Sequence, residues 1–93
     1  MEQETKHLRI HGRVQGVGYR AWMAELASRM RLHGWVRNRK DKTVEAVVSG
    51  YEDEVQKFIS ECYSGPSQAK VEVIHVTDGI DEDLDSFEIR DTL

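Results

Sequence analysis

The chain of 93 residues has one cysteine, one proline and no long hydrophobic run, and each shortage excludes a class of protein. The lone Cys62 excludes an intramolecular disulfide and suits a reducing compartment. No apolar stretch approaches the roughly 20 residues that a membrane-spanning helix needs. The N-terminal residues MEQETKH lack the apolar core of a secretory signal. We therefore expect a cytoplasmic protein with no membrane partner.

Length and composition fit one folded domain. The sequence is 39% hydrophobic and 32% charged, and a chain of 93 residues can bury a core without a disulfide or a structural metal. No internal repeat or low-complexity segment divides it. We expect residues 1–93 to form a single domain.

The charge is distributed unevenly along the chain. The net charge is −4, yet residues 6–42 hold ten Lys and Arg against two acidic residues, Glu25 and Asp41. A basic segment of this kind favours an anionic partner, although a solvated surface would have the same composition.

The first third of the sequence changes from strand to helix periodicity. Residues 6–14 alternate, with Leu8 and Ile10 on one face, which is the period of a half-buried strand. From residue 19 the apolar residues follow helical spacing, and Gly34 is expected to end that helix. The predicted apolar stripe consists of Tyr19, Trp22, Met23, Leu26, Ala27 and Met30.

The remaining segments complete a β-α-β-β-α-β order. Strands are predicted at 34–38, 43–50 and 69–76, with a short strand at 86–90. Ser49 and Glu52 have capping-box spacing, which predicts the start of the second helix. Its predicted apolar stripe is Tyr51, Val55, Phe58, Ile59 and Cys62, and Ser64-Gly65-Pro66 follows it. We predict a ferredoxin-like α/β sandwich, with two helices on one face of a four- to five-stranded, mainly antiparallel sheet.

The segment GRVQGVGYR, residues 12–20, connects the first strand to the first helix. Gly16 and Gly18 can adopt backbone angles closed to other residues and let a ligand approach the main chain. Successive amides in such a loop, together with a helix start, bind anions, and Arg20 lies where its guanidinium could grip phosphate oxygens. The segment therefore predicts a phosphate-binding loop. It is also compatible with a tight strand-to-helix turn that carries an exposed arginine.

Two other phosphate motifs do not fit this loop. Gly16-x-Gly18-x-x-Ala21 matches a dinucleotide-binding fingerprint, but the acidic residue expected about 20 positions later is absent and Asn38 lies near that position. A Walker A loop would require Gly-Lys-Ser/Thr at its end, and the sequence has Gly18-Tyr19-Arg20 there.

The predicted topology brings Asn38 to the same sheet edge as the loop. In a split β-α-β unit the first two strands run parallel with a third strand between them, so their carboxyl ends face one edge. The two ends would then lie about two strand spacings apart, roughly 10 Å. That gap could hold a phosphate and a water between Arg20 and Asn38.

Two segments together resemble the signatures of the acylphosphatase family. The first has Val14-Gln15-Gly16-Val17, then one residue, an aromatic residue and Arg20 in the family's order. The second, GWVRN at 34–38, is followed by Val44 and Gly50 at the family's spacing. The resemblance covers most of the chain and implies the ferredoxin-like fold predicted above.

The resemblance implies an enzyme that hydrolyses acyl phosphates to a carboxylate and inorganic phosphate. It implies that Arg20 binds the phosphate and that the side-chain amide of Asn38 holds the attacking water. The family implies no metal, no cofactor and no covalent intermediate, a small-molecule substrate and a monomer. Backbone amides of the loop are expected to help bind the phosphate, namely those of Gln15, Gly16, Val17, Gly18 and Tyr19.

One position departs from the family pattern. In the hairpin after GWVRN the family usually has glycine, where this chain has Lys42. A lysine held in a left-handed conformation would cost roughly 1–2 kcal/mol, whereas another turn type would avoid that cost.

The alternative to an enzyme is a non-catalytic domain that binds a phosphorylated ligand or a nucleic acid. RNA recognition on this fold would need exposed aromatic residues on the central strands, and LRIHGRV and VEAVVSG contain none. The presence of both Arg20 and Asn38 favours catalysis. We therefore expect no nucleic-acid partner.

The other reactive side chains are predicted to have structural roles. The four histidines lack metal-ligand spacing, and residues 81–85 lack the pattern of a calcium loop. Cys62 is expected in the core, Tyr19 is expected to anchor the loop, and Trp35 is expected to pack under the hairpin.

Overall fold

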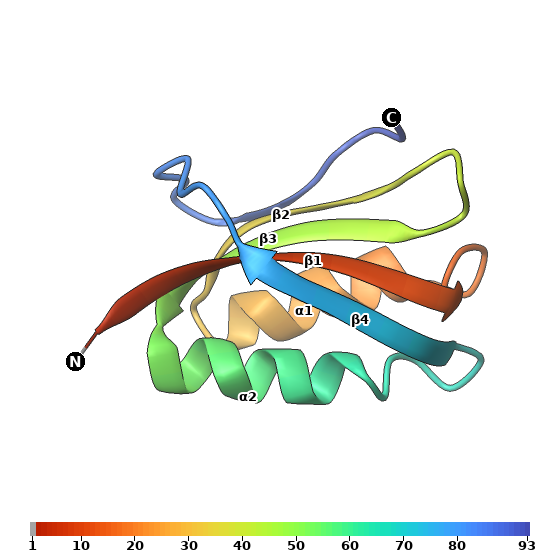
Figure 1. The fold of residues 1–93 in the computed structure, drawn as a ribbon, viewed down its shortest axis with the longest axis horizontal. Coiled ribbons are helices and arrows are strands. Elements are labelled where there is room, and N and C mark those ends of the chain that lie inside the picture. The colour runs from red at the N-terminus through yellow and green to blue at the C-terminus, as the bar shows by residue number, and fades with distance from the viewer. Residues whose placement is uncertain (1) are drawn as a thin grey trace.

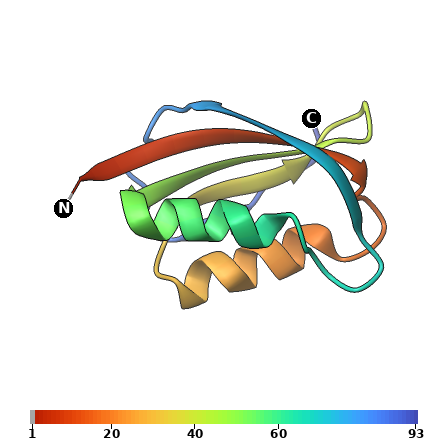
Figure 2. The same cartoon turned by 60° about the horizontal axis from the view of Figure 1, so that its bottom comes forward.

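The computed structural model describes residues 2–93, which form two layers: a five-stranded sheet and two helices. Along the chain the elements are β1 (Gln3–Arg13), α1 (Tyr19–Arg29), β2 (His33–Asn38), β3 (Val44–Tyr51), α2 (Glu52–Cys62), β4 (Lys70–Asp78) and β5 (Phe87–Ile89). Both helices cover the same face of the sheet (Figures 1 and 2). The predicted ferredoxin-like fold is confirmed. No helix within residues 2–93 is long and apolar enough to cross a membrane.

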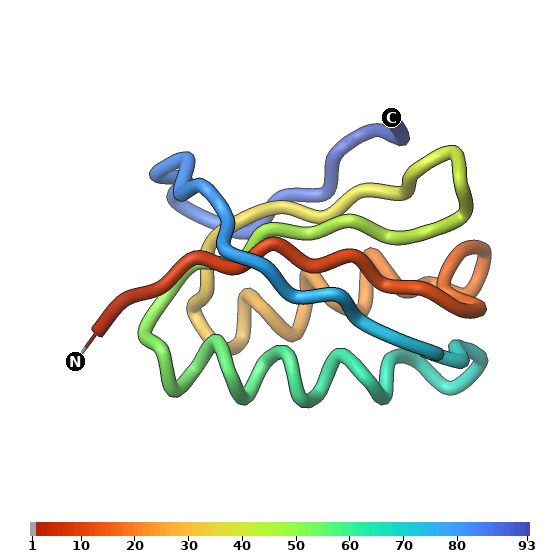
Figure 3. The backbone as a smooth tube through the Cα atoms, in the orientation of Figure 1, coloured from red at the N-terminus to blue at the C-terminus, as the bar shows by residue number. Residues whose placement is uncertain are grey.

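The strand order β4-β1-β3-β2-β5 places the ends of β1 and β2 at one edge. Both strands pair antiparallel with β3, so they run parallel to each other with β3 between them. The short strand β5 pairs parallel with β2, with Val36 opposite Ile89. The last residues then continue beside β2 (Figure 3). There, Arg90 N–H donates to the Val36 carbonyl and Leu93 N–H donates to the Asn38 carbonyl.

The core lies between the sheet and the helices, and it uses most of the residues that the periodicity predicts, although Trp22 and Met30 are only partly buried against it. Leu8 and Ile10 of β1 are fully buried, as are Val55 and Phe58 of α2. Cys62 is also fully buried, and burial raises the pKa of its thiol to about 12. The prediction that Cys62 is a core residue is confirmed.

The first helix ends differently from the prediction. Gly34 does not end α1, because it lies inside β2 opposite Val48. The chain reverses at Arg31, whose φ of 59° is left-handed. Gly34 instead has a φ of 143° and packs so closely on β3 that a Cβ there would collide with the Val47 carbonyl. The need for close strand packing, and not helix termination, explains this glycine.

The predicted capping box at the second helix is wrong. Ser49 lies in β3, and its hydroxyl pairs with the Thr5 hydroxyl at 2.8 Å. The residue before the helix is Tyr51, which makes no side-chain cap and is 46% exposed, so it does not join the apolar stripe. Strand β3 continues to residue 51 because it pairs with β1 to its last residue, and this pairing overrides the local capping signal.

Trp35 also packs elsewhere than predicted. It lies on the sheet face opposite the helices, where its indole N–H donates to Glu82 at 3.0 Å. The guanidinium groups of Arg37 and Arg90 each lie 4.9 Å from its ring centroid. Trp35 therefore fixes the acidic loop and the C-terminal segment to the sheet, and it does not pack under the hairpin.

Candidate active site

A cavity of about 230 Å³ lies at the sheet edge where β1 and β2 end. Six of the seven residues predicted for the site line it, and Val17 is the exception, because its half-buried side chain packs on the core. Val14, Ala21 and Ile89 also line it and were not predicted as site residues from the sequence. The full lining is Val14, Gln15, Gly16, Gly18, Tyr19, Arg20, Ala21, Asn38 and Ile89.

The loop between β1 and α1 presents a run of free amides. Among residues 2–93, no backbone group accepts a hydrogen bond from the N–H groups of residues 15–21. Gly16 and Gly18 have φ values of 73° and 79°, and a Cβ on either glycine would meet no atom within 4 Å. Gly18 also begins α1 without a side-chain cap, so the helix start keeps its free donors. Free amides at a helix start attract an anion.

Arg20 adds a positive charge to this run of amides. It lies in the first turn of α1 and lines the cavity. The ion pairs found within residues 2–93 use Lys6, Arg9, His7, Arg39 and Arg90 but leave Arg20 free. A guanidinium with no carboxylate partner is available to an anionic ligand.

Tyr19 holds the start of α1 in place. Its side chain is 1% exposed, and its hydroxyl donates to the Cys62 carbonyl of α2 at 2.6 Å. Burial raises the pKa of this phenol, so the hydroxyl remains a donor. Tyr19 therefore anchors the loop to α2, as predicted from the sequence.

Asn38 faces the cavity from the last position of β2. Its backbone carbonyl accepts the N–H of Leu93, which holds the strand end against the C-terminal segment. Its side-chain Oδ1 is buried and has no hydrogen-bond partner among the described residues. A buried acceptor without a partner is costly, and a ligand or a water in the cavity would satisfy it.

The side chain of Gln15 has a role that the sequence did not reveal. Its Nε2 donates to the Arg39 carbonyl at 2.8 Å and to the Thr43 carbonyl at 2.9 Å. These bonds join the loop to the β2–β3 hairpin, and they fix the loop relative to Asn38. No sequence pattern could have assigned this role, since both acceptors are backbone groups more than 20 residues away.

The hairpin uses the left-handed conformation in which the family favours glycine. Arg39 N–H donates to the Thr43 carbonyl at 2.9 Å, and Lys42 N–H donates to the Arg39 carbonyl at 3.0 Å. Lys42 has a φ of 75°. A tight turn followed by a left-handed residue is a common three-residue hairpin loop. Lys42 therefore adopts the left-handed conformation that this hairpin loop requires, with the steric strain that a Cβ causes there.

A carboxylate of β3 contacts the β2–β3 hairpin from the sheet face that the helices do not cover. Glu45 of β3 accepts a hydrogen bond from His7 at 2.7 Å and pairs with Arg39 at 3.3 Å. Burial by itself would raise the pKa of Glu45, but the His7 hydrogen bond and the charges of Arg39 and Arg9 hold it below its usual value. Of the ten Lys and Arg in residues 6–42, Arg9 and Arg39 pair with this carboxylate.

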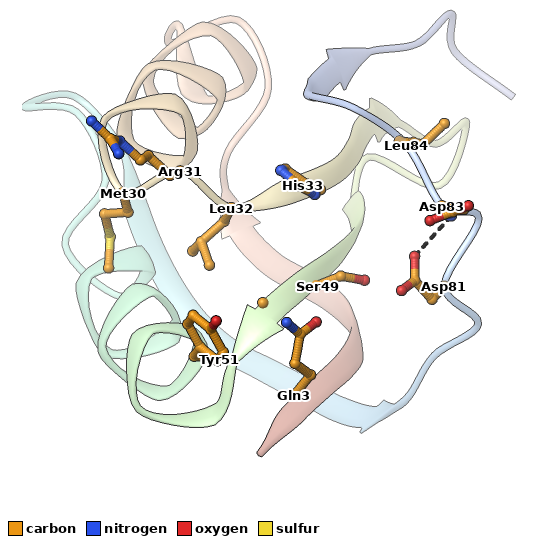
Figure 4. Close-up of a pocket in the computed structure, with 11 residues that line it drawn as sticks. Gln3, Met30, Arg31, Leu32, His33, Ser49, Tyr51, Asp81, Asp83 and Leu84 are labelled. Carbon is orange, nitrogen blue, oxygen red and sulfur yellow. Dashed lines mark hydrogen bonds between the residues drawn. The ribbon is translucent and has the colours of Figure 1, made fainter. Parts of the chain in front are cut away.

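A larger hollow of about 460 Å³ lies at the opposite end of β2 and β3 and holds none of the predicted site residues (Figure 4). In this hollow Ser49 bonds Thr5 and Asp81 accepts the Asp83 N–H at 2.8 Å, and none of the side-chain polar atoms that are buried without a partner in residues 2–93 belongs to its lining. The smaller cavity has the free amides of the loop, Arg20 and the unpaired Oδ1 of Asn38, so it is the better candidate for an active site.

Comparison with known proteins decides the family. The sequence model of the family described as Acylphosphatase matches residues 6–89. An acylphosphatase from Rhodopseudomonas palustris is 54% identical over 74 residues, which cover 80% of this chain and 75% of that protein. One from Acidovorax is 49% identical over 96% of this chain and 92% of its own length. The chain belongs to the acylphosphatase family.

Structural comparison agrees with this assignment. The crystal structure of acylphosphatase from Bacillus subtilis superposes with a TM-score of 0.90 at 34% identity, and it covers 96% of this chain and 99% of that one. As an acylphosphatase, the protein is a hydrolase that acts on acyl phosphates. The family and activity expected from the two signature segments are confirmed.

Proposed function

We propose that this acylphosphatase binds the phosphate of its substrate with Arg20 and the free amides of residues 15–19, and that Asn38 holds the attacking water. One observation carries the proposal: unpaired donors and an unpaired acceptor line the same cavity. The guanidinium and the amides match the negative phosphate oxygens, whereas the Asn38 Oδ1 can accept a hydrogen bond from a water.

The reaction needs no strong acid or base. The water oxygen attacks phosphorus, the bond from phosphorus to the acyl oxygen breaks, and the carboxylate leaves with the electron pair. The pKa of an ordinary carboxylic acid is near 4, so the leaving group departs without a proton. The proton of the water goes to the phosphate or to solvent. A loose phosphoryl-transfer transition state needs positioning and charge stabilisation above all.

No metal has a part in this proposal. Among residues 2–93, no three His, Cys, Asp or Glu side chains gather in a group that could hold a metal ion. We expect the enzyme to be a monomer in the cytoplasm with a small-molecule substrate. Hydrolysis of benzoyl phosphate should persist in excess chelator, and complete loss of activity that returns with added Mg²⁺ would contradict the proposal.

A substitution of Asn38 distinguishes positioning of the water from binding of the phosphate. Asn38→Ala should lower kcat by about 10²-fold, while inorganic phosphate still inhibits at its original concentration. The mutated residue would no longer hold the water, but Arg20 and the amides would still hold the phosphate. An unchanged kcat in Asn38→Ala would refute the water-holding role.

The role of Arg20 has a matched control on the same helix. Arg20→Ala should weaken inhibition by phosphate about 10- to 100-fold, because a hydrogen bond to a charged group contributes about 1.5–3 kcal/mol. Arg29 lies exposed in the last turn of α1, at the end of the helix away from the cavity, and Arg29→Ala should leave inhibition unchanged. Equal effects of the two substitutions would point to overall charge and not to a phosphate contact.

A further inference from the structure

An exposed apolar side chain, that of Ile89, lines the same cavity as Arg20 and Asn38. Within β5 the side chains alternate: Phe87 is buried against Phe58, and Glu88 pairs with Arg90. Ile89 therefore points to the same side as Phe87, toward the helices. Phe87 is 8% exposed, whereas Ile89 is 50% exposed and lines the cavity. The hydrophobic core therefore includes Phe87 but not Ile89, whose side chain borders the cavity.

The cavity has two chemically different parts. The free amides, Arg20 and Asn38 form the polar part, whereas Ala21 and Ile89 contribute exposed apolar surface. Ala21 follows Arg20 directly on α1, and Ile89 lies on the strand next to the one that carries Asn38. An acyl phosphate has the same division, because a charged phosphate is joined to an organic acyl group. A phosphate held by Arg20 would leave its acyl group beside these apolar side chains.

The charge around the cavity also favours an apolar acyl group. Arg20 is the only charged residue in the lining among residues 2–93, and no carboxylate takes part. Glu88, the nearest acidic residue in sequence to Ile89, pairs with Arg90 and lies on the other face of β5. An acyl group with a cationic substituent would find no partner here, whereas an apolar group would exclude water from Ile89.

We infer that Ile89, with Ala21, is the specificity-determining contact for the acyl group, and that the enzyme prefers acyl phosphates with a bulky apolar acyl group. This inference rests on the proposed placement of the phosphate on Arg20. It assigns Ile89 no part in the chemical step. Ile89 contributes by contact with the acyl group, so its effect depends on the size of that group.

Two substrates that differ only in the acyl group test this inference. The wild-type enzyme should have a higher kcat/KM for benzoyl phosphate than for acetyl phosphate. Ile89→Thr keeps a β-branched side chain in the strand but makes it polar, and it should lower kcat/KM for benzoyl phosphate about tenfold. The value for acetyl phosphate should change less than about twofold, because its methyl group has little surface to lose. Inhibition by inorganic phosphate should be unchanged.

The chain offers a control of the same residue type. Ile80 is 81% exposed and lies outside this cavity, so Ile80→Thr should change neither substrate's kcat/KM. Ile89→Leu retains an apolar contact and should keep the preference for benzoyl phosphate, and it provides a second measurement if the threonine variant does not fold. An equal fall for both substrates in Ile89→Thr would overturn the inference, as would a wild type without preference. Failure of the proposed phosphate site would differ, because Arg20→Ala would then leave phosphate inhibition intact.

Discussion

Replacement of Lys42 by glycine should stabilise this protein. Lys42 has a φ of 75° in the β2–β3 hairpin, and its side chain is exposed. Within residues 2–93 it takes part in no ion pair, and its backbone N–H donates to the Arg39 carbonyl. Glycine would keep this backbone bond and would remove the steric cost of a Cβ in the left-handed region.

The size of the effect follows from two opposing contributions. Relief of the left-handed strain gains about 1–2 kcal/mol. The added freedom of glycine in the unfolded chain costs about 0.4–1 kcal/mol. With central values of about 1.5 and 0.7 kcal/mol for these two contributions, the net gain in the free energy of unfolding is about 0.8 kcal/mol. For a domain of this size, 1 kcal/mol corresponds to about 4–8 °C, so the Tm should rise by about 2–8 °C.

Thermal and urea unfolding of the wild type, Lys42→Gly and Lys40→Gly would measure this effect. Lys40 lies in the same hairpin loop, is also exposed, and is not among the residues with positive φ. Lys40→Gly therefore loses the same side chain without relief of strain, and its Tm should fall. The reasoning is refuted if Lys42→Gly lowers the Tm, or if both substitutions shift the Tm in the same direction by the same amount.

Four further predictions concern the loop, the sheet and the core. Gln15→Leu removes both hydrogen bonds to the hairpin and should cost about 1–3 kcal/mol of stability while weakening phosphate inhibition, as measured by urea unfolding and inhibition kinetics. Gly34→Ala should cost more than about 4 kcal/mol and should reduce soluble folded protein, because its Cβ would collide with the Val47 carbonyl, whereas Gly16→Ala should cost only about 1–2 kcal/mol. Folding lowers the pKa of the Glu45 carboxyl, so this group's contribution to stability is present at neutral pH and is lost as the pH falls through the folded-state pKa. Glu45→Gln should therefore be less stable than wild type at pH 7. Between about pH 5 and 3, however, it should lose less stability than wild type does. Burial raises the pKa of the Cys62 thiol from 9.0 to about 12, so alkylation at pH 8 should be about 10³-fold slower in the native protein than in urea, and equal rates would show that the thiol is exposed.

Local patterns in the sequence were enough to predict the fold and the chemical character of the loop. The alternation around Leu8 and Ile10 and the helical spacing after Tyr19 reflect burial on one face, and burial decides both elements in the structure. The element order also implied that β1 and β2 end at one sheet edge, because a right-handed β-α-β unit leaves few alternatives. Predictions based on single polar or glycine residues were less successful. Gly34 and Ser49 both lie within strands because pairing with neighbouring strands outweighs a local stop or cap signal.

The sequence by itself determined the acylphosphatase family, the glycine loop with its arginine, and the strand that ends in Asn38. Only the tertiary structure decided what completes the cavity. Gln15 reaches carbonyls of a distant hairpin, and Ile89 enters the cavity wall because β5 pairs in parallel with β2. Both contacts depend on backbone pairing between segments far apart in the chain. Backbone groups are the same in every residue, so no side-chain pattern records which of them will meet.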